Sequence, residues 1–539
     1  MNRKTRFAKM AGGAAVLALA AACNPDLNVT NPNQPDVARA ISTPSDVRQL
    51  IGSSYNTFYL GMQGCAVSPC EPDPGLAVDV MGDVMTMAYG NFGARFNGQE
   101  PRVAYNNTSA GGDGKVAEVS YTAMYSALGA ANDGLKAIGR GVRVAESSSA
   151  PDETPQFQAF AWLVQGMALG FESEVFDKGF IVTEATADGD ATLVDYKAVR
   201  DGAIASLDKA IAASTGKSWT IPGEFTTTAL TLSADNLRRM ANTMAARALV
   251  YNARNATENT ATNWPKVLQY ASNGISTGST SFDLSIQGDG GTTWFDLLKG
   301  YGELRSWVRT DQRIIQEADP SQPIEWSSTN PPPFPAIADL RFAHGSKDAS
   351  GDIRPKGADY WFNNAVPYDP ARGVYFFSQW SHARYVDHGY DVANSFLTVA
   401  PYVLAAENDL ILAEALVRTG GDLAKAASLI NKTRVGRGGL PAVTAATPKN
   451  DLLGAIFYEY DVELMDTGAG VGWFNRRRID PSVTYNGLPI GNIWASKGGS
   501  NLQKGTPRHL PLPAKELETL GMVVYTYGGA SPNPVFPEQ

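Results

Sequence analysis

The sequence has few histidines and no excess of basic residues, and each scarcity excludes a class of function. Its four histidines form no His-x-x-x-His or His-Glu-x-x-His arrangement, so a catalytic zinc site has no support. With 45 basic and 54 acidic residues the formal net charge is −9, which repels phosphate backbones and argues against nucleic-acid binding. Gly-x-Ser-x-Gly, Walker and Rossmann motifs are missing as well. We therefore expect no enzymatic activity, no metal and no cofactor.

Long apolar runs are also missing, because the apolar stretch at residues 10–22 is too short to cross a membrane as a helix. It follows a basic segment, and that layout is typical of a secretory signal. The stretch ends Leu19-Ala-Ala-Ala-Cys23, which resembles a bacterial lipoprotein signal whose cysteine is acylated. An ordinary cleaved signal is the alternative, since the leucine lies four residues before the cysteine instead of three. We predict a signal peptide over 1–22, a lipid on Cys23 and a polar, proline-rich tether over 23–36.

Only two further cysteines are present, Cys65 and Cys70, in a stretch rich in glycine and proline. Export places them in an oxidising compartment, where a five-residue offset in a loop can close a small disulfide ring. A redox pair is the alternative, but the Cys-x-x-Cys spacing is missing. We predict a disulfide that staples the loop.

The rest of the chain has the composition of a folded protein with much irregular backbone. It is 43% hydrophobic, and 53 Gly and 32 Pro exceed ordinary usage. Apolar residues recur at helical spacing in four segments between residues 116 and 275, and Thr154-Pro155 has the pattern of a helix N-cap followed by proline. The pattern returns over 402–468, where Gly420-Gly421 predicts a helix end and Asp422 the next N-cap.

Between these helical parts, the pattern fails over residues 277–400, which are crowded with Gly, Pro, Asn and aromatic residues. An irregular segment of this length inside a folded body is usually functional. Paired helices that each bury one face predict a solenoid of tetratricopeptide type. We therefore predict a mainly α fold, a tetratricopeptide-like helix-pair solenoid with a large irregular loop-rich insertion, in a single body over 37–539.

The C-terminal third carries a series of motifs that together resemble the SusD/RagB family of nutrient-binding outer-membrane lipoproteins. An acidic, alanine-rich helix over 405–418 precedes an Asn-x-x-Arg-x-x-Arg ending at Arg437. A Glu-x-x-x-Glu-Leu element with Glu459 and Glu463, a Trp-Phe pair and a closing Leu-Pro-Leu-Pro-Ala-Lys-Glu-Leu element over 510–517 follow. Tyr460 stands where the family commonly has arginine.

This resemblance implies a lipid-anchored substrate-binding protein at the outer membrane, facing the cell exterior. It implies a ligand site built mainly from loops, and a TonB-dependent barrel transporter (SusC-like) as partner. An oligosaccharide is the first expected ligand and an oligopeptide the second. An α-helical glycan hydrolase or lyase, and a solenoid adaptor that binds only proteins, are the rival functions.

Aromatic side chains are the best candidates for ligand contact, because the apolar faces of sugar rings lie on Trp and Tyr rings. Most should pack the loops onto the helices, since large aromatic residues are highly buried on average. An early strip shared with the family's ligand region adds amide and guanidinium groups. The candidate ligand-binding residues are Tyr89, Asn91, Phe92, Arg95, Trp294, Tyr301, Trp307, Trp326, Tyr360, Trp361, Tyr375 and Trp380.

Glu459 and Glu463 lie four residues apart and so share one helix face, a spacing that suits either catalysis or structure. The catalytic interpretation needs a cleft around both carboxylates. We prefer a structural role, in which they pair with arginines such as Arg434, Arg476 or Arg477 and hold the last helices together.

Overall fold

The structure is a computed structural model. It describes residues 41–63, 74–87, 93–98, 102–110, 115–187, 189–227, 229–277, 280–290, 293–327, 332–365, 374–386, 397, 399–479, 483–485, 488–489 and 502–529, with the backbone alone at residues 95, 96, 327, 374, 375, 488 and 489. Within the body that begins at Thr43, the architecture is mainly helical with small two-stranded sheets, which confirms the predicted fold class.

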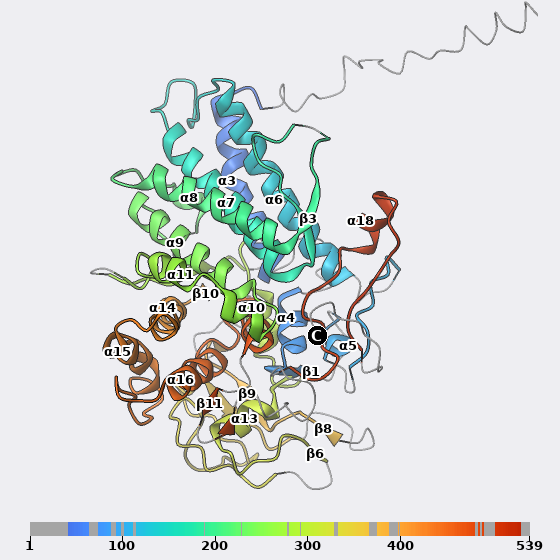
Figure 1. Ribbon diagram of the computed structural model, residues 1–539, viewed down its shortest axis with the longest axis vertical. Coiled ribbons are helices and arrows are strands. Elements are labelled where there is room, and N and C mark those ends of the chain that lie inside the picture. The colour runs from blue at the N-terminus through green and yellow to red at the C-terminus, as the bar shows by residue number, and fades with distance from the viewer. Residues whose placement is uncertain are drawn as a thin grey trace, which may run out of the picture. The chain divides into compact units, whose positions relative to one another are not determined.

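The scaffold is a succession of helices in which each packs on its neighbours in the chain, as expected for a helix-pair solenoid (Figure 1). In chain order these helices are α3 (Pro44–Gln63), α6 (Lys115–Gly139), α7 (Thr154–Val175), α8 (Tyr196–Ser214), α9 (Ala234–Tyr251), α11 (Trp264–Ala271), α14 (Ala405–Thr419), α15 (Leu423–Arg434) and α16 (Lys449–Val462). The shorter helices are α4 (Pro74–Met81), α5 (Ala94–Asn97), α10 (Ala256–Ala261), α12 (Leu297–Gly302), α13 (Gln312–Ala318), α17 (Val471–Arg478) and α18 (Ala514–Thr519).

Helix ends follow local capping chemistry. Gly420 ends α14 in the left-handed region at φ 67°, and the Asp422 side chain accepts from the Lys425 N–H at the start of α15, as predicted. The prediction for α7 was wrong by one residue: Glu153 is the N-cap, and the Thr154 hydroxyl accepts from the Val144 N–H instead.

Helix α3 lies outside the predicted helices, and it packs against both α6 and α7. Its N-terminus is a capping box, in which the Thr43 N–H and hydroxyl donate to Asp46 and the Asp46 N–H donates to the Thr43 hydroxyl. Residues 43–46 therefore carried a start signal that the sequence analysis missed.

The strands all form antiparallel two-stranded sheets, and most of them lie in the insertion between α11 and α14. The pairs are β1 (Met85–Met87) with β5 (Val308–Thr310), β2 (Lys178–Phe180) with β3 (Leu193–Asp195), β4 (Leu284–Gln287) with β10 (Val399–Val403), β6 (Trp326–Ser327) with β8 (Val374–Tyr375), β7 (Tyr360–Phe362) with β9 (Trp380–His382), and β11 (Thr484–Tyr485) with β12 (Leu488–Pro489). The insertion thus contains short helices and short paired strands where the sequence predicted irregular backbone.

Among the described residues, no helix has the length and apolar character that a membrane crossing requires.

Candidate ligand-binding site

Two of the predicted ligand residues, Tyr301 and Trp307, form a stacked and partly exposed pair, which we call the aromatic platform. Their ring centroids lie 5.6 Å apart with 15° between the ring planes. A tight turn creates the stack, since the Leu304 N–H donates to the Tyr301 carbonyl and the Trp307 N–H donates to the Leu304 carbonyl. Both side chains are half-buried, so part of each remains accessible to a ligand. Nearly parallel rings give the flat apolar surface on which a sugar ring can lie.

Strand pairing connects the segment that carries the platform to β1, which precedes the early candidate strip in the sequence. Trp307 directly precedes β5, whose first residue Val308 pairs with Met87 at the end of β1. The sequence analysis proposed these two regions separately, and the β1–β5 sheet joins them. Outside the described residues lie Cys23, Cys65, Cys70, Tyr89, Asn91 and Phe92, and the side chains of Arg95 and Tyr375.

The other predicted aromatic residues lie in the interior. Trp294 packs against Tyr55 and Tyr59 of α3. The Tyr360 hydroxyl donates to the Val462 carbonyl at 2.7 Å, and the indole N–H of Trp326 donates to a main-chain carbonyl. We leave Trp294, Trp326, Tyr360 and Trp380 out of the aromatic platform, because a ring that is less than a tenth exposed offers no open face on which a sugar ring could lie.

Trp361 is also buried, but it lies next to the platform region. Its indole N–H donates to the Pro355 carbonyl, and the Arg305 guanidinium covers its ring at 5.0 Å from the centroid. Arg305 is four residues from Tyr301 and two from Trp307 in the chain. A cation therefore lies near the platform, at a distance at which it interacts with the indole face.

The paired acids of α16 serve a structural purpose, as expected, but with other partners than those predicted. Arg341 binds Glu459 through two contacts at 2.7 and 3.0 Å and reaches Glu463 at 3.1 Å. Glu463 also pairs with Arg384 and Arg437. The expected partners bind other groups. Arg434 donates to the Pro441 carbonyl and the Tyr485 hydroxyl, and Arg476 binds Asp461 and Glu317. Arg477 donates to main-chain carbonyls.

The ion pairs on α16 govern the protonation of its acids. Burial raises the pKa of Glu459, and Arg341 offsets only part of that effect. Burial also opposes ionisation of Glu463, but three arginines outweigh burial and lower its pKa. Both carboxylates are at most 1% exposed. Buried carboxylates held by arginines in this way are available neither to protonate a leaving group nor to activate water.

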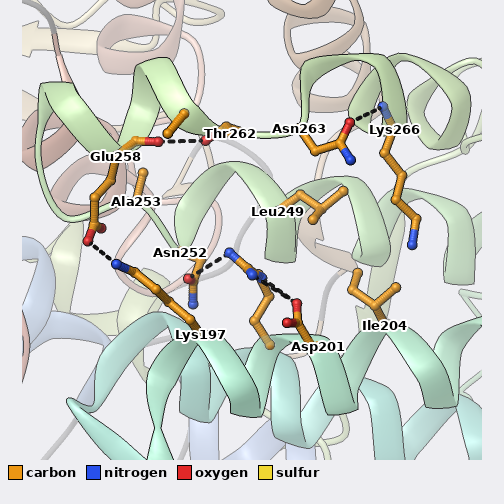
Figure 2. A pocket seen from close by; sticks show the side chains of 12 residues that line it. Lys197, Asp201, Ile204, Leu249, Asn252, Ala253, Glu258, Thr262, Asn263 and Lys266 are labelled. Atoms are coloured by element: carbon orange, nitrogen blue, oxygen red, sulfur yellow. Dashed lines mark hydrogen bonds and ion pairs between the residues drawn. The ribbon is translucent and has the colours of Figure 1, made fainter.

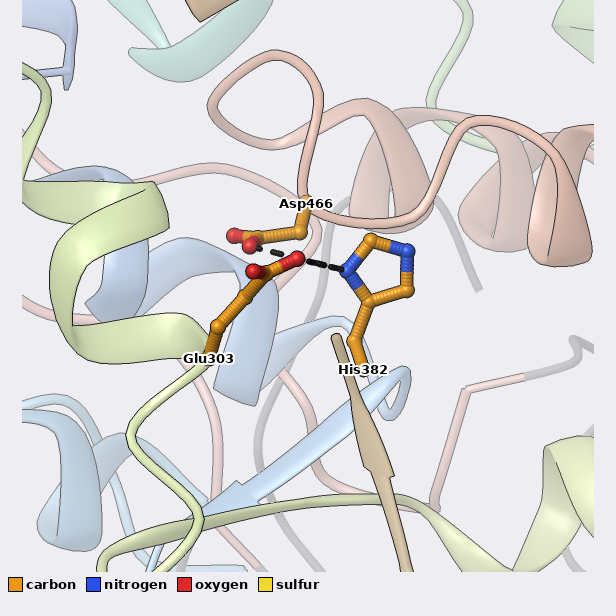
Figure 3. Close-up of side chains that lie close together, drawn as sticks. All are labelled: Glu303, His382 and Asp466. Atoms are coloured by element: carbon orange, nitrogen blue, oxygen red, sulfur yellow. Dashed lines mark ion pairs between the residues drawn. The ribbon is translucent and has the colours of Figure 1, made fainter. Parts of the chain in front are cut away.

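A second arrangement of titratable groups is the buried cluster of Glu303, His382 and Asp466 (Figure 3). His382 Nδ1 lies 2.7 Å from a Glu303 oxygen and 3.7 Å from an Asp466 oxygen. Burial lowers the pKa of His382, but the two carboxylates outweigh burial and raise it to about 9. Burial raises the pKa of Asp466 to about 7. At neutral pH the cluster therefore contains an imidazolium between two acids.

Imidazole and carboxylate groups are also zinc ligands, so we compared the geometry of this cluster with that of a metal site. Tetrahedral ligands about 2.0–2.1 Å from zinc lie about 3.3 Å from each other. The 2.7 Å separation of His382 and Glu303 is shorter than this and is the distance of a close ion pair. We interpret the cluster as a charge network that joins three parts of the chain.

A cavity of about 440 Å³ lies between α8, α9, α10 and α11 (Figure 2). Five charged groups line it, and four of them form two ion pairs: Lys197 contacts Glu258 at 2.7 Å, and Arg200 contacts Asp201 at 2.8 Å. Burial opposes ionisation of Glu258, but hydrogen bonds from Lys197 and Tyr196 outweigh burial and lower its pKa. No aromatic residue is among the described residues that line this cavity, so the aromatic platform is the candidate site that we consider further.

The sequence matches no protein-family model and no curated protein sequence. Solved structures do match. A SusD superfamily protein from Parabacteroides distasonis ATCC 8503 aligns with a TM-score of 0.57 and 13% identity over 88% of this chain and 96% of its own. The chain has the fold of the SusD superfamily.

Two further structures with the SusD fold have informative descriptions. The surface glycan-binding protein A from Bacteroides uniformis aligns with a TM-score of 0.55 and 15% identity over 89% of this chain and 98% of its own. A SusD-like carbohydrate binding protein from Bacteroides vulgatus ATCC 8482 aligns with a TM-score of 0.54 and 12% identity over 83% of this chain and 85% of its own. Each match covers more than four fifths of this chain, so the SusD fold extends over most of it.

Proposed function

We propose that the protein binds an oligosaccharide at the aromatic platform and releases it chemically unchanged. The stacked, half-buried pair of Tyr301 and Trp307 carries this proposal, because it offers a flat apolar surface at an accessible position. Two proteins that share the SusD fold are described as glycan-binding and carbohydrate-binding. Their ligand class supports a saccharide as the first ligand to test.

A binding role without catalysis fits the state of the acidic residues. Glu459 and Glu463 have the spacing of an acid–base pair, yet both are buried and form ion pairs with arginines. The acids of the buried cluster are directed at His382. Glycoside hydrolysis needs two carboxyl groups that flank the scissile bond, and neither of these acid pairs is placed to do so.

On the basis of the sequence, we also propose that the protein is anchored to the membrane and works with a transporter. Acylation of Cys23 would confine the protein to the outer membrane and raise its effective concentration near a membrane partner. That partner is a TonB-dependent barrel transporter of the SusC type, to which the protein delivers its ligand. Isolation of the lipidated protein from membranes in mild detergent should recover the barrel with it, and recovery of the protein alone would contradict this part.

The binding role is tested by isothermal titration calorimetry of the full-length protein in mild detergent with a panel of oligosaccharides. We expect at least one to bind, and we expect Trp307→Ala to weaken it about ten-fold or more, since a Trp ring supplies a large share of the contact area. Trp162→Ala is the matched control, because Trp162 is a half-buried tryptophan on the scaffold. Binding that Trp307→Ala leaves unchanged, or binding of oligopeptides in place of saccharides, would contradict the proposal.

A further inference from the structure

Arg309 on β5 is a buried cation that makes no ion pair among the described residues. It is 4% exposed, and its Nη1 donates only to the Ser381 hydroxyl at 3.2 Å and, at 3.4 Å, to the Val308 carbonyl. Its Nε has no acceptor among the described residues. Other buried arginines are better satisfied: Arg341 binds carboxylates, and Arg254 donates to three main-chain carbonyls. Arg309 is therefore left with unused donors.

The surroundings of Arg309 make its charge costly. Burial and the nearby Arg305 lower its pKa to about 10, although Asp352 acts in the opposite direction. The guanidinium stays charged at neutral pH, because about 10 is still well above 7. A buried charge without a counter-ion is unfavourable. An anion placed against Arg309 would relieve this cost, and it would also reduce the repulsion from Arg305.

The strand register shows where that anion would lie. Trp361 on β7 pairs with Ser381 on β9, so these two side chains share one face of the β7–β9 sheet. Arg309 donates to Ser381 and Arg305 covers Trp361, so both arginines lie on this same face. Tyr360 and its partner His382 on β9 take the opposite face, since successive side chains of a strand alternate.

The aromatic platform adjoins this face through the chain itself. Trp307 stands between Arg305 and Arg309 in the sequence and stacks on Tyr301. Ring surface and cationic groups therefore come from one stretch of nine residues, 301–309. A ligand on this stretch would meet an apolar plane and a guanidinium side by side.

We propose that the ligand is an acidic oligosaccharide, in which a uronic acid ring lies near the aromatic platform and its carboxylate pairs with Arg309. A uronic acid has both features in one unit, an apolar ring face and a carboxylate fixed to the ring. A guanidinium binds a carboxylate through two parallel hydrogen bonds, which Lys cannot do. The net charge of −9 repels acidic ligands at long range, so recognition depends on this local pair. An acidic peptide lacks the rigid ring and fits the flat platform less well.

This inference rests on the proposed function, and the experiment separates the two. The probes are trigalacturonic acid and its fully methyl-esterified form, which keeps the rings and removes the negative charges. Calorimetry on the full-length protein at low salt should show at least ten-fold tighter binding of the acid. Arg309→Met should remove that preference, whereas Trp307→Ala should weaken the binding of both probes.

Arg309→Lys tests the same point in a variant that keeps the charge, and we expect it to retain only part of the preference because lysine lacks the planar fork. Raised salt should reduce the preference of the wild-type protein. Equal binding of both probes, or a preference that both Arg309 variants retain, would overturn the inference and leave the proposed function standing. If the protein binds neither probe and no neutral oligosaccharide, both the inference and the proposed function are overturned. If it binds only an acidic peptide, and that binding depends on Arg309, the proposed ligand class is wrong.

Discussion

His382 is expected to stabilise the fold strongly, because it is the cation between two buried carboxylates. At an effective dielectric constant of about 20, unit charges 2.7 Å apart attract by about 6 kcal/mol. Asp466 lies 3.7 Å from His382 and has a pKa of about 7, so at neutral pH it adds only part of the about 4.5 kcal/mol of a full charge. Desolvation offsets part of this attraction, but removal of one partner leaves the other charges buried and unpaired. We therefore expect His382→Gln to lower the free energy of unfolding by about 3–5 kcal/mol at neutral pH.

A double variant makes the prediction specific to charge. His382→Gln with Asp466→Asn removes the cation and one of the two acids, and Glu303 keeps its hydrogen bonds from the backbone N–H groups of Tyr385 and Val386. The double variant should therefore be more stable than the His382→Gln variant alone. Such non-additivity is the signature of a direct interaction between neighbours.

The pH dependence of stability follows from the sign of the pKa shifts. The folded protein raises the pKa of His382 from 6.5 to about 9, so its contribution is complete below pH 6.5 and is lost as the pH rises through 9. A rise in the pKa of His382 from 6.5 to about 9 corresponds to about 3.4 kcal/mol of stability. The raised pKa of Asp466 acts in the same direction at lower pH, with stability lost as the pH rises through about 7. The double variant should show a flatter profile.

The assay is urea unfolding followed by tryptophan fluorescence between pH 6 and 9.5. His344→Gln is the control, because His344 is exposed and makes one hydrogen bond to a main-chain carbonyl. The reasoning is refuted if His382→Gln lowers the unfolding midpoint no more than this control does. A double variant less stable than His382→Gln would refute it equally.

Two further predictions concern the scaffold. Glu414→Gln should cost about 3–5 kcal/mol of unfolding free energy in urea titrations, because Glu414 binds two nitrogens of Arg478 at 2.8 Å in the interior. Burial raises the pKa of Glu414, but the two guanidinium groups beside it outweigh burial and lower it to about 2, so this contribution should persist above pH 4.5 and disappear only as the pH falls toward 2. Gly454→Ala should destabilise the protein, since its methyl group would lie 1.7 Å from the Thr484 carbonyl oxygen, whereas Gly129→Ala in α6 meets no atom within 4 Å and should stabilise it by about 0.5–1 kcal/mol. Thermal unfolding of both variants checks the opposite signs, and equal effects would contradict the packing argument.

The helical scaffold was predictable because its signals are local. Apolar periodicity fixed the buried faces, and Gly420 and Asp422 marked an end and a start that the structure confirms. The capping box at Thr43 and Asp46 is an equally local signal, and attention to it would have revealed α3. Strand pairs of two or three residues within the insertion carry no comparable periodicity, so the sequence predicted only irregular backbone there.

The candidate site was predictable in composition but not in arrangement. Trp294 and Trp307 are the same residue type in the same segment, yet one is in the core and the other half-exposed, because their tertiary neighbours differ. Strand register likewise separates Tyr360 from the adjacent Trp361. Arg309 was not singled out, since the lack of a partner for a guanidinium is a property of the folded chain that no spacing expresses.

The acids of α16 connect the scaffold to the proposed site. Arg341 in the insertion binds the Glu459 carboxylate, and Tyr360 on β7 donates to the Val462 carbonyl at the end of the same helix. Because side chains alternate along a strand, fixing Tyr360 toward α16 turns Trp361 to the opposite face, where the arginines lie. We therefore expect Glu459 to affect binding at the proposed site only through the position of β7. A catalytic acid would contact the ligand directly. The motif with Glu459 and Glu463 suggests catalysis in the sequence, but in the structure it supports the strand β7, which carries part of the proposed binding surface.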